Sequence, residues 1–185
     1  MFGSEEKTSP LKPVLILLAI LLLGGATFWF MNTRQSAALS IPKTQLYAAH
    51  TTTAAAAGGG NIVGQAAEAD DDLYVAVTLH LKNNLSLPLF IDTVAATYTD
   101  ATDATMDTRA LGHIDLARTE DIFPALTPLT PNPFPLNLAI PAGATTEGTI
   151  LLHFPGLTEQ TWKARKSAVL TLNFTHQPPQ TVNLP

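Results

Sequence analysis

Residues that alternate between apolar and polar side chains define the clearest predicted strand, which runs from Leu73 to Lys82. Its first face carries only aliphatic residues: Leu73, Val75, Val77, Leu79 and Leu81. The opposite face is mixed: Tyr74, Ala76, Thr78, His80 and Lys82. A period of two residues is that of a β-strand with one buried face. The following pair, Asn83 and Asn84, is typical of a turn, because asparagine tolerates left-handed backbone conformations.

The same two-residue period recurs in shorter segments along the rest of the chain. Further strands are predicted at 87–99, 145–154 and 168–175, with a terminal strand around Val182 and Leu184. Weaker patterns predict short strands at 41–48, 62–67, 106–110 and 136–140. About seven or eight short strands separated by turns favour an all-β fold, an antiparallel β-sandwich.

Three segments interrupt the strand pattern and are predicted to be crossovers between the sheets. The segment 114–123 is predicted to form a short helix that Pro124 ends. Residues 124–135 hold five prolines in twelve residues, which favours an extended, solvated connection rather than a ladder strand. Residues 158–166 suit one or two helical turns with Thr158 as the N-cap.

Near the start, eighteen residues from Val14 to Met31 carry no charge. As a helix this run is about 27 Å long, close to the hydrocarbon thickness of a bilayer. Pro13 suits the first turn, and Phe28, Trp29 and Phe30 crowd the far end, where aromatic rings favour the membrane interface. The run predicts an uncleaved transmembrane signal-anchor. The alternative is a cleaved signal peptide ending near 36–38, although its apolar core normally runs only about 7–15 residues.

These patterns divide the chain into four predicted parts. Residues 1–13 form a short cytoplasmic tail, 14–31 the transmembrane helix, 32–60 an Ala/Thr/Gly-rich tether and 61–185 the β-sandwich domain. The Lys/Arg bias around the span is slight, and a short N-terminal tail favours the N-terminus inside. We therefore expect a single-pass protein of a bacterial inner (plasma) membrane, with its C-terminal domain periplasmic or extracellular.

Composition excludes several classes of function. Among the 185 residues, 15 are acidic and 10 basic, a net charge of −5, which argues against a nucleic-acid partner. The absence of cysteine excludes disulfides, thiolate metal sites, iron–sulfur clusters and cysteine nucleophiles. No Ser–His–Asp arrangement or nucleophile elbow is suggested by spacing, so we expect no catalytic residues, no cofactor and no enzyme.

Acidic clusters give the only metal candidate. Glu68, Asp70, Asp71 and Asp72 form the densest group, and Ca²⁺ takes six to eight oxygen ligands. Their spacing matches no EF-hand loop, so a weak calcium site stands beside the plainer interpretation of a solvated turn before a strand. Three further aspartates, Asp100, Asp103 and Asp107, form a looser second group.

Histidines and one basic patch complete the candidates. The five histidines show no metal spacing, and His80 and His153 would meet only if their strands adjoin; solvent-facing histidines are the favoured interpretation. Trp162 with Lys163, Arg165 and Lys166 could touch lipid headgroups or an acidic partner. The favoured alternative is a crossover whose tryptophan packs against the sandwich, because residues 61–185 hold 13 acidic against 6 basic residues.

Two stretches, Leu73–Asn84 and Ile140–Phe154, together resemble the telokin-like immunoglobulin domains of bacterial envelope proteins. The first corresponds to a core strand ending in Asn-Asn, and the second to a Pro-Ala-Gly turn, a second glycine and a strand ending in phenylalanine. The resemblance covers about residues 61–185 and implies an immunoglobulin-like sandwich on an anchored, extracytoplasmic protein. It implies no functional residues, and this chain departs from it in its 114–135 crossover and its lack of a lipobox cysteine.

Together these observations predict a non-catalytic, single-pass membrane-anchored module that mediates protein–protein contact in the cell envelope, as an accessory subunit of a membrane complex. The alternative is a stand-alone extracytoplasmic domain that binds a ligand or Ca²⁺, through the acidic 68–72 segment or a pocket at one end of the sandwich.

Overall fold

A computed structural model describes residues 11–32, 35–53, 68–136 and 138–185. Side chains are described throughout these ranges except at 11–13, 28, 30–32, 51–53 and 68–70. The chain divides into two compact units, Met1–Gln35 and Ser36–Pro185, and each is considered by itself.

The first unit contains one helix, α1 (Leu11–Asn32), of 22 residues. Its described side chains, at 14–27 and 29, are all exposed. In the part of the chain that the structure describes, no helix has the length and apolarity needed to cross a membrane.

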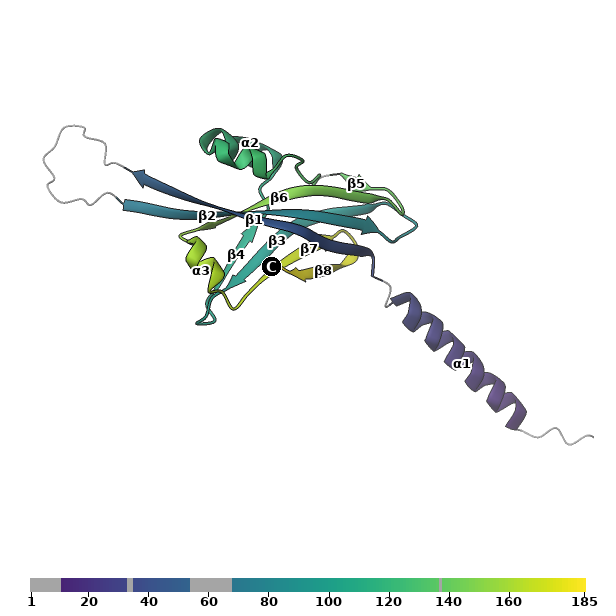
Figure 1. The fold of residues 1–185 in the computed structure, drawn as a ribbon. Coiled ribbons are helices and arrows are strands. Elements are labelled where there is room, and N and C mark those ends of the chain that lie inside the picture. The colour runs from purple at the N-terminus through teal and green to yellow at the C-terminus, as the bar shows by residue number, and fades with distance from the viewer. Residues whose placement is uncertain (1–10, 33–34, 54–67, 137) are drawn as a thin grey trace, which may run out of the picture. The chain divides into compact units, whose positions relative to one another are not determined.

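The second unit is built from two antiparallel sheets (Figure 1). The first sheet has the order β1–β2–β6, formed by Ala37–Thr53, Glu68–Asn83 and Thr145–Pro155. The second has the order β4–β3–β7–β8, with β5 also pairing with β3. Its strands are β3 (Leu89–Thr99), β4 (Thr105–Arg109), β5 (Ala139–Ile140), β7 (Ser167–Phe174) and β8 (Gln177–Asn183). The described residues therefore confirm an all-β sandwich-like fold of eight strands in two sheets.

The main core lies between the sheets. The aliphatic face of β2 is completely buried, as the alternation predicts, and packs with Phe154 of β6 and with Leu170 and Leu172 of β7. A short helix, α3 (Glu159–Lys163), inserts Trp162 into this core, where the indole is 2% exposed. Thr158 caps α3 by accepting a hydrogen bond from the Thr161 N–H, as predicted.

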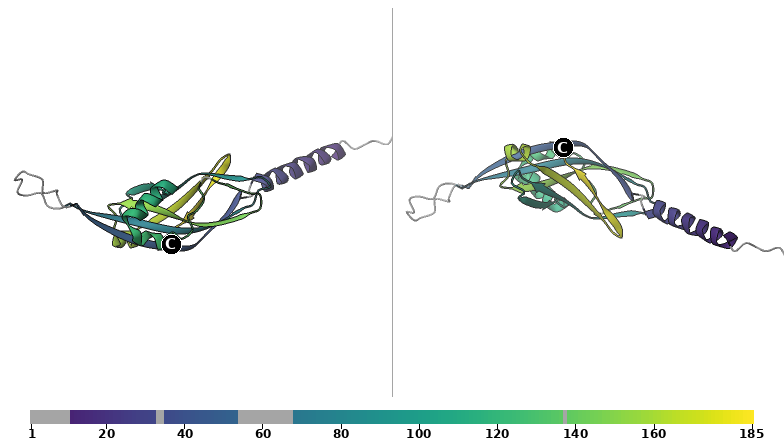
Figure 2. Two further views of the ribbon diagram at one scale, coloured as in Figure 1. Left: turned by 90° about the horizontal axis from the view of Figure 1, so that it is seen from above. Right: turned by 90° about the horizontal axis from the view of Figure 1, so that it is seen from below.

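A second, smaller core lies on the outer face of the three-stranded sheet. The helix α2 (His113–Ile122) and the 3₁₀ helix η1 (Pro124–Leu129) cover this face (Figure 2). Leu116 and Leu126 from these helices pack with Tyr74 and Ala76 of β2, which are only 6% and 2% exposed. The prediction that β2 has one buried face is therefore wrong for this part of the strand, because a helical layer seals its second face.

The predicted tether at 32–60 is wrong for residues 37–53, which form β1. Each residue of β1 from Lys43 onward has a partner in β2, from Lys43–Thr78 to Thr53–Glu68. The predicted short strand at 41–48 lies inside this longer one. The compact unit starts at Ser36 rather than at residue 61. The remainder of the predicted tether, 54–60, and the weak strand at 62–67 lie outside the described residues.

The proline-rich crossover is also more ordered than predicted. After η1, the Asn132–Phe134 segment runs along the outer edge of β6, with a hydrogen bond from Phe134 N–H to Thr149 O at 2.9 Å. The Phe134 ring is 5% exposed and belongs to the core between the sheets. Gly148 permits this close approach, since a Cβ there would lie 2.6 Å from Phe134 Cα. The proline-rich segment thus places the Phe134 side chain in the core and is not a solvated connection.

The buried hydroxyl group of Thr44 in β1 allows a test of how much an unsatisfied polar group costs in this fold. Its Oγ1 is shielded from solvent and has no hydrogen-bond partner. We expect Thr44→Val to stabilise the fold by about 1 kcal/mol, because an unsatisfied buried hydroxyl is replaced by a methyl group of the same shape. Urea unfolding measures this change, and a destabilised valine variant would contradict it.

Candidate functional site

The predicted acidic cluster lies within strand β2 and not in a turn before it. Glu68, Asp70, Asp71 and Asp72 are all part of the ladder with β1. The side chains of Glu68 and Asp70 lie outside the described set. Asp71 Oδ1 lies 2.5 Å from His50 Nδ1, and Asp72 Oδ1 lies 3.2 Å from His153 Nε2. The two described carboxylates thus point to different histidines, as expected for neighbours on a strand.

Asp71 and Asp72 also line a shallow cleft of about 250 Å³ with His50 and Glu159. Glu159 is paired with Lys163 at 2.7 Å. No group of three or more metal-ligating side chains is found among the residues whose side chains are described. The calcium site therefore stays a prediction, which now depends on Glu68 and Asp70.

The second acidic group, Asp100, Asp103 and Asp107, has structural roles in and beside the β3–β4 turn. Asp100 accepts hydrogen bonds from the Thr102 side chain and from the backbone N–H groups of Thr102 and Ala104. These bonds, the Thr102 hydroxyl first, lower the pKa of Asp100. Asp103 pairs with Lys166, and Asp107 accepts from Thr97 at 2.6 Å. The three carboxylates therefore bind separate partners.

Two of the histidines lie on adjoining strands but do not meet. In the β2–β6 register, His80 lies opposite Glu147 and His153 opposite Tyr74. His80 Nε2 is 2.8 Å from Glu147 Oε1. The imidazole of His153 stacks on Tyr74 with ring centres 4.6 Å apart, and its Nε2 is shielded from solvent without a well-directed hydrogen bond. His153 is thus half-buried, with 33% of its side chain exposed, and not fully solvent-facing as expected.

The raised pKa of Tyr74 leads us to expect a loss of stability at alkaline pH. Burial, and then the nearby Asp72 and Tyr47, raise its pKa above the ordinary value of 10.0. Tyr74 therefore ionises first in the unfolded chain, so its contribution to stability is constant below about pH 10 and falls as pH rises further. Urea unfolding at pH 9 and pH 11 should show this fall, and Tyr74→Phe should reduce it. An equal fall in both proteins would contradict the assignment.

The basic and aromatic patch is confirmed as a packed crossover. The indole of Trp162 faces the core, and the Arg165 guanidinium lies 4.4 Å from its ring centre. Arg165 also donates to the carbonyl groups of Trp162, Leu184 and Pro185. Because the indole is enclosed, it is not available to lipid headgroups.

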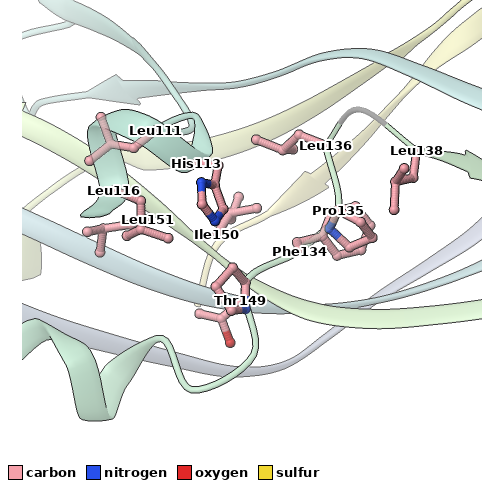
Figure 3. Close-up of a pocket in the computed structure, with 11 residues that line it drawn as sticks. Leu111, His113, Leu116, Phe134, Pro135, Leu136, Leu138, Thr149, Ile150 and Leu151 are labelled. Atoms are coloured by element: carbon pink, nitrogen blue, oxygen red, sulfur yellow. The ribbon is translucent and has the colours of Figure 1, made fainter. Parts of the chain in front are cut away.

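An apolar cleft of about 370 Å³ lies beside the outer edge of β6 (Figure 3). Its described walls come from Leu111 and the start of α2, from 133–136 and Leu138, and from β6, and none of these residues is Asp, Glu, Lys or Arg. The imidazole of His113 is the main polar group of this lining. Leu138 at the rim is 65% exposed. Sequence reasoning missed this cleft, because its residues are brought together only by tertiary contacts.

The outer edge of β1 is the longest open strand edge in the described sandwich. One side of β1 pairs with β2, and no backbone hydrogen bond joins the other side to a described residue. By contrast, the outer edge of β6 is bonded to Leu111 and to Asn132–Phe134. Pro42 and a bulge between Ser40 and Lys43 interrupt β1 near its start. From Lys43 onward the edge is uninterrupted, and such an edge is a template for another strand.

Comparisons with known proteins assign no family. No family model and no curated protein matches the chain. One similar solved structure, a structural-genomics target designated SoR45, has 10% identity and a TM-score of 0.39, covering 81% of this chain and 83% of that one. Another, from Bordetella pertussis and described as a candidate ApaA protein, has 12% identity and a TM-score of 0.32, covering 82% and 91%.

Proposed function

We propose that this protein is a non-catalytic, single-pass membrane-anchored module whose β-sandwich head contacts another protein of the bacterial cell envelope. In this role it is an accessory subunit of a membrane complex, with the head periplasmic or extracellular. We further propose that the head is immunoglobulin-like, on the strength of the two quoted sequence stretches and the two antiparallel sheets.

The anchor is supported by the sequence of α1. The eighteen residues from Val14 to Met31 carry no charge, and as a helix such a run would be about 27 Å long, close to the hydrocarbon thickness of a bilayer. Its large aliphatic side chains from Val14 to Leu23 are 54–67% exposed. So many exposed aliphatic side chains are costly in water and are favourable in lipid.

The observation that carries the contact role is the open edge of β1. Backbone N–H and C=O groups along such an edge bind an extended chain through ordinary sheet hydrogen bonds. Three histidine–carboxylate pairs join neighbouring strands: His50 to Asp71, His80 to Glu147 and His153 to Asp72. Such pairs have a structural role, which fits a non-catalytic contact function.

Co-purification of the full-length protein from its native membrane in mild detergent tests this role. We expect one protein at near-equal abundance in quantitative mass spectrometry. A preparation without a stoichiometric partner would contradict the accessory-subunit role. Proteolysis of intact cells with a permeabilised outer layer tests the topology, and a protected head would overturn it.

The apolar cleft favours a second candidate function, the binding of a small ligand. Its volume falls in the range of small-molecule sites and equals that of about a dozen water molecules. Because no charged side chain lines it, the buried part of a ligand would be uncharged, with His113 offering one hydrogen bond.

The cysteine-free sequence allows a direct test of the cleft. Leu138→Cys places a thiol at its rim, and Ile122→Cys places one at a similarly exposed position of α2 that does not line it. For a ligand site, the rate ratio of a hexyl to a cationic methanethiosulfonate should be about tenfold higher at position 138. Equal ratios would remove this candidate. For the calcium alternative, an unchanged thermal midpoint on adding Ca²⁺ would do the same.

A further inference from the structure

We propose that β1 accepts an extended segment of a partner protein as a fourth strand of the β1–β2–β6 sheet, along Lys43–Ala49. The inference rests on the proposed contact function and specifies how the contact is made.

The hydrogen bonds of β2 show which backbone groups of β1 face outward. The N–H of Asn84 donates to Ser36 O, on the β1 side, and the N–H of Asn83 donates to Ala144 O, on the β6 side. Since these directions alternate along a strand, even-numbered residues of β2 bond toward β1. Their partners after the bulge are Lys43, Gln45, Tyr47 and Ala49.

The intervening residues of β1, Thr44, Leu46 and Ala48, therefore direct their N–H and C=O groups away from β2. Each has one donor and one acceptor, so an added strand gains up to about six backbone hydrogen bonds. The open stretch is about 24 Å long at the usual rise per residue. This length is typical of one ordinary strand.

Neighbouring features limit the site to this stretch. Toward the start of β1, the bulge and Pro42 break the ladder, and the Gln180 side-chain amide binds Ala37 O at 2.5 Å. Of the other outer strands, β6 is bonded to chain segments along its edge, β8 carries Pro178 and Pro179, and β4 has only five residues. Proline at a strand edge is a usual protection against strand addition. Among the described residues, Thr44–Ala48 has no proline and no backbone hydrogen bond on its outer side, and its end at Ala48 lines a cleft beside 157–160.

The side chains of β1 determine which residue types suit the partner segment. Leu46 and Ala48 are half-buried against the main core, so partner residues on this face are apolar. On the other face, Tyr47 packs against the second core, whereas polar partner residues suit Lys43 and Gln45, with a carboxylate beside the exposed Lys43. The partner segment is therefore a proline-free strand of alternating apolar and polar residues with an acidic residue at one end.

Proline variants test the inference on the partner that co-purifies with the wild-type chain. Thr44→Pro and Ala48→Pro each remove an outward N–H, which an edge strand tolerates. Thr181→Pro is the matched control: Leu184 N–H bonds to Ala168 of β7, so Thr181 by alternation also faces outward, but on β8. We expect recovery of the partner to fall roughly tenfold in the β1 variants and to be unchanged in the control.

Amide hydrogen exchange gives a second readout that needs no variant. In the wild-type protein alone, the amides of Thr44, Leu46 and Ala48 should exchange fast, and the partner should slow them by at least about tenfold. Strand addition would be overturned by a stoichiometric partner whose recovery is unchanged in the β1 proline variants and which does not slow exchange of the β1 amides. The contact function would then still stand. The absence of any partner would overturn both.

Discussion

Replacing Gly148 with alanine is expected to destabilise the head by about 3 kcal/mol, at the upper end of the range for overpacking. The added Cβ would lie 2.6 Å from Phe134 Cα and 2.9 Å from Phe134 N. These are backbone atoms of a segment that is hydrogen-bonded to Thr149 on both sides, so the neighbour cannot move aside cheaply. Urea unfolding followed by the fluorescence of the buried Trp162 measures the loss.

A second glycine provides the matched control. A Cβ at Gly112 would meet nothing within 4 Å, and its backbone φ of −68° suits any residue. We therefore expect Gly112→Ala to cost less than about 1 kcal/mol, because alanine is only a poorer N-cap residue than glycine. Similar losses in the two variants would show that the close approach at Gly148 is not the cause.

Phe134 separates the backbone clash from side-chain packing. Its buried ring fills the core between the sheets, so Phe134→Ala should cost about 3–5 kcal/mol on its own. Because the clash in Gly148→Ala involves the Phe134 backbone, truncating the ring should not rescue that variant. A double variant as stable as either single one would contradict this account.

Local pattern predicted the strands well wherever one face of the strand is uniformly aliphatic. The strands at 145–154 and 168–175, like the one from Leu73, are found within a residue or two at their C-terminal ends, because their alternating side chains face the main core. The packed position of Trp162 was also predicted correctly, because the acidic composition of the head argued against a lipid-binding patch.

The errors arise where burial depends on segments distant in the sequence. Tyr74 and Ala76 are buried by Leu116 and Leu126, which lie about forty to fifty residues later in the chain. Strand β1 is hidden by its composition: Ala48, Ala49 and the following threonines resemble a linker, and only the register with β2 shows them to be a strand. The apolar cleft and the open β1 edge are likewise products of topology.

Asn83 shows how a residue predicted for one role can have another. It ends β2 completely buried, and its side-chain Nδ2 donates to three carbonyl groups, of Leu87, Ile140 and Pro141, at 2.8–3.1 Å. Its Oδ1 accepts from the Leu85 N–H at 2.9 Å. One amide therefore joins the end of β2 to the following loop and to β5, and its left-handed tolerance is not used.

Replacing Asn83 with alanine is expected to cost about 4 kcal/mol, because three carbonyl groups and one N–H lose their partner in a region largely closed to water. Asn132→Ala is the surface control: its amide makes one exposed bond to Glu147 O, so the loss should stay below about 0.5 kcal/mol. Thermal or urea unfolding of both variants compares the two amides directly.

Asn83→Asp tests the direction of the hydrogen bonds rather than the volume of the side chain. The new carboxylate keeps the shape of the amide but directs a negative charge at three carbonyl oxygens, so at neutral pH this variant should be less stable than Asn83→Ala. The fold then favours the protonated acid, which raises the pKa of the new carboxyl group above that in the unfolded chain. The folded state binds the extra proton, so stability should recover as pH falls toward the unfolded value near 4. Flat stability between pH 4 and pH 8, relative to wild type, would mean that Asn83 does not donate to these carbonyl groups.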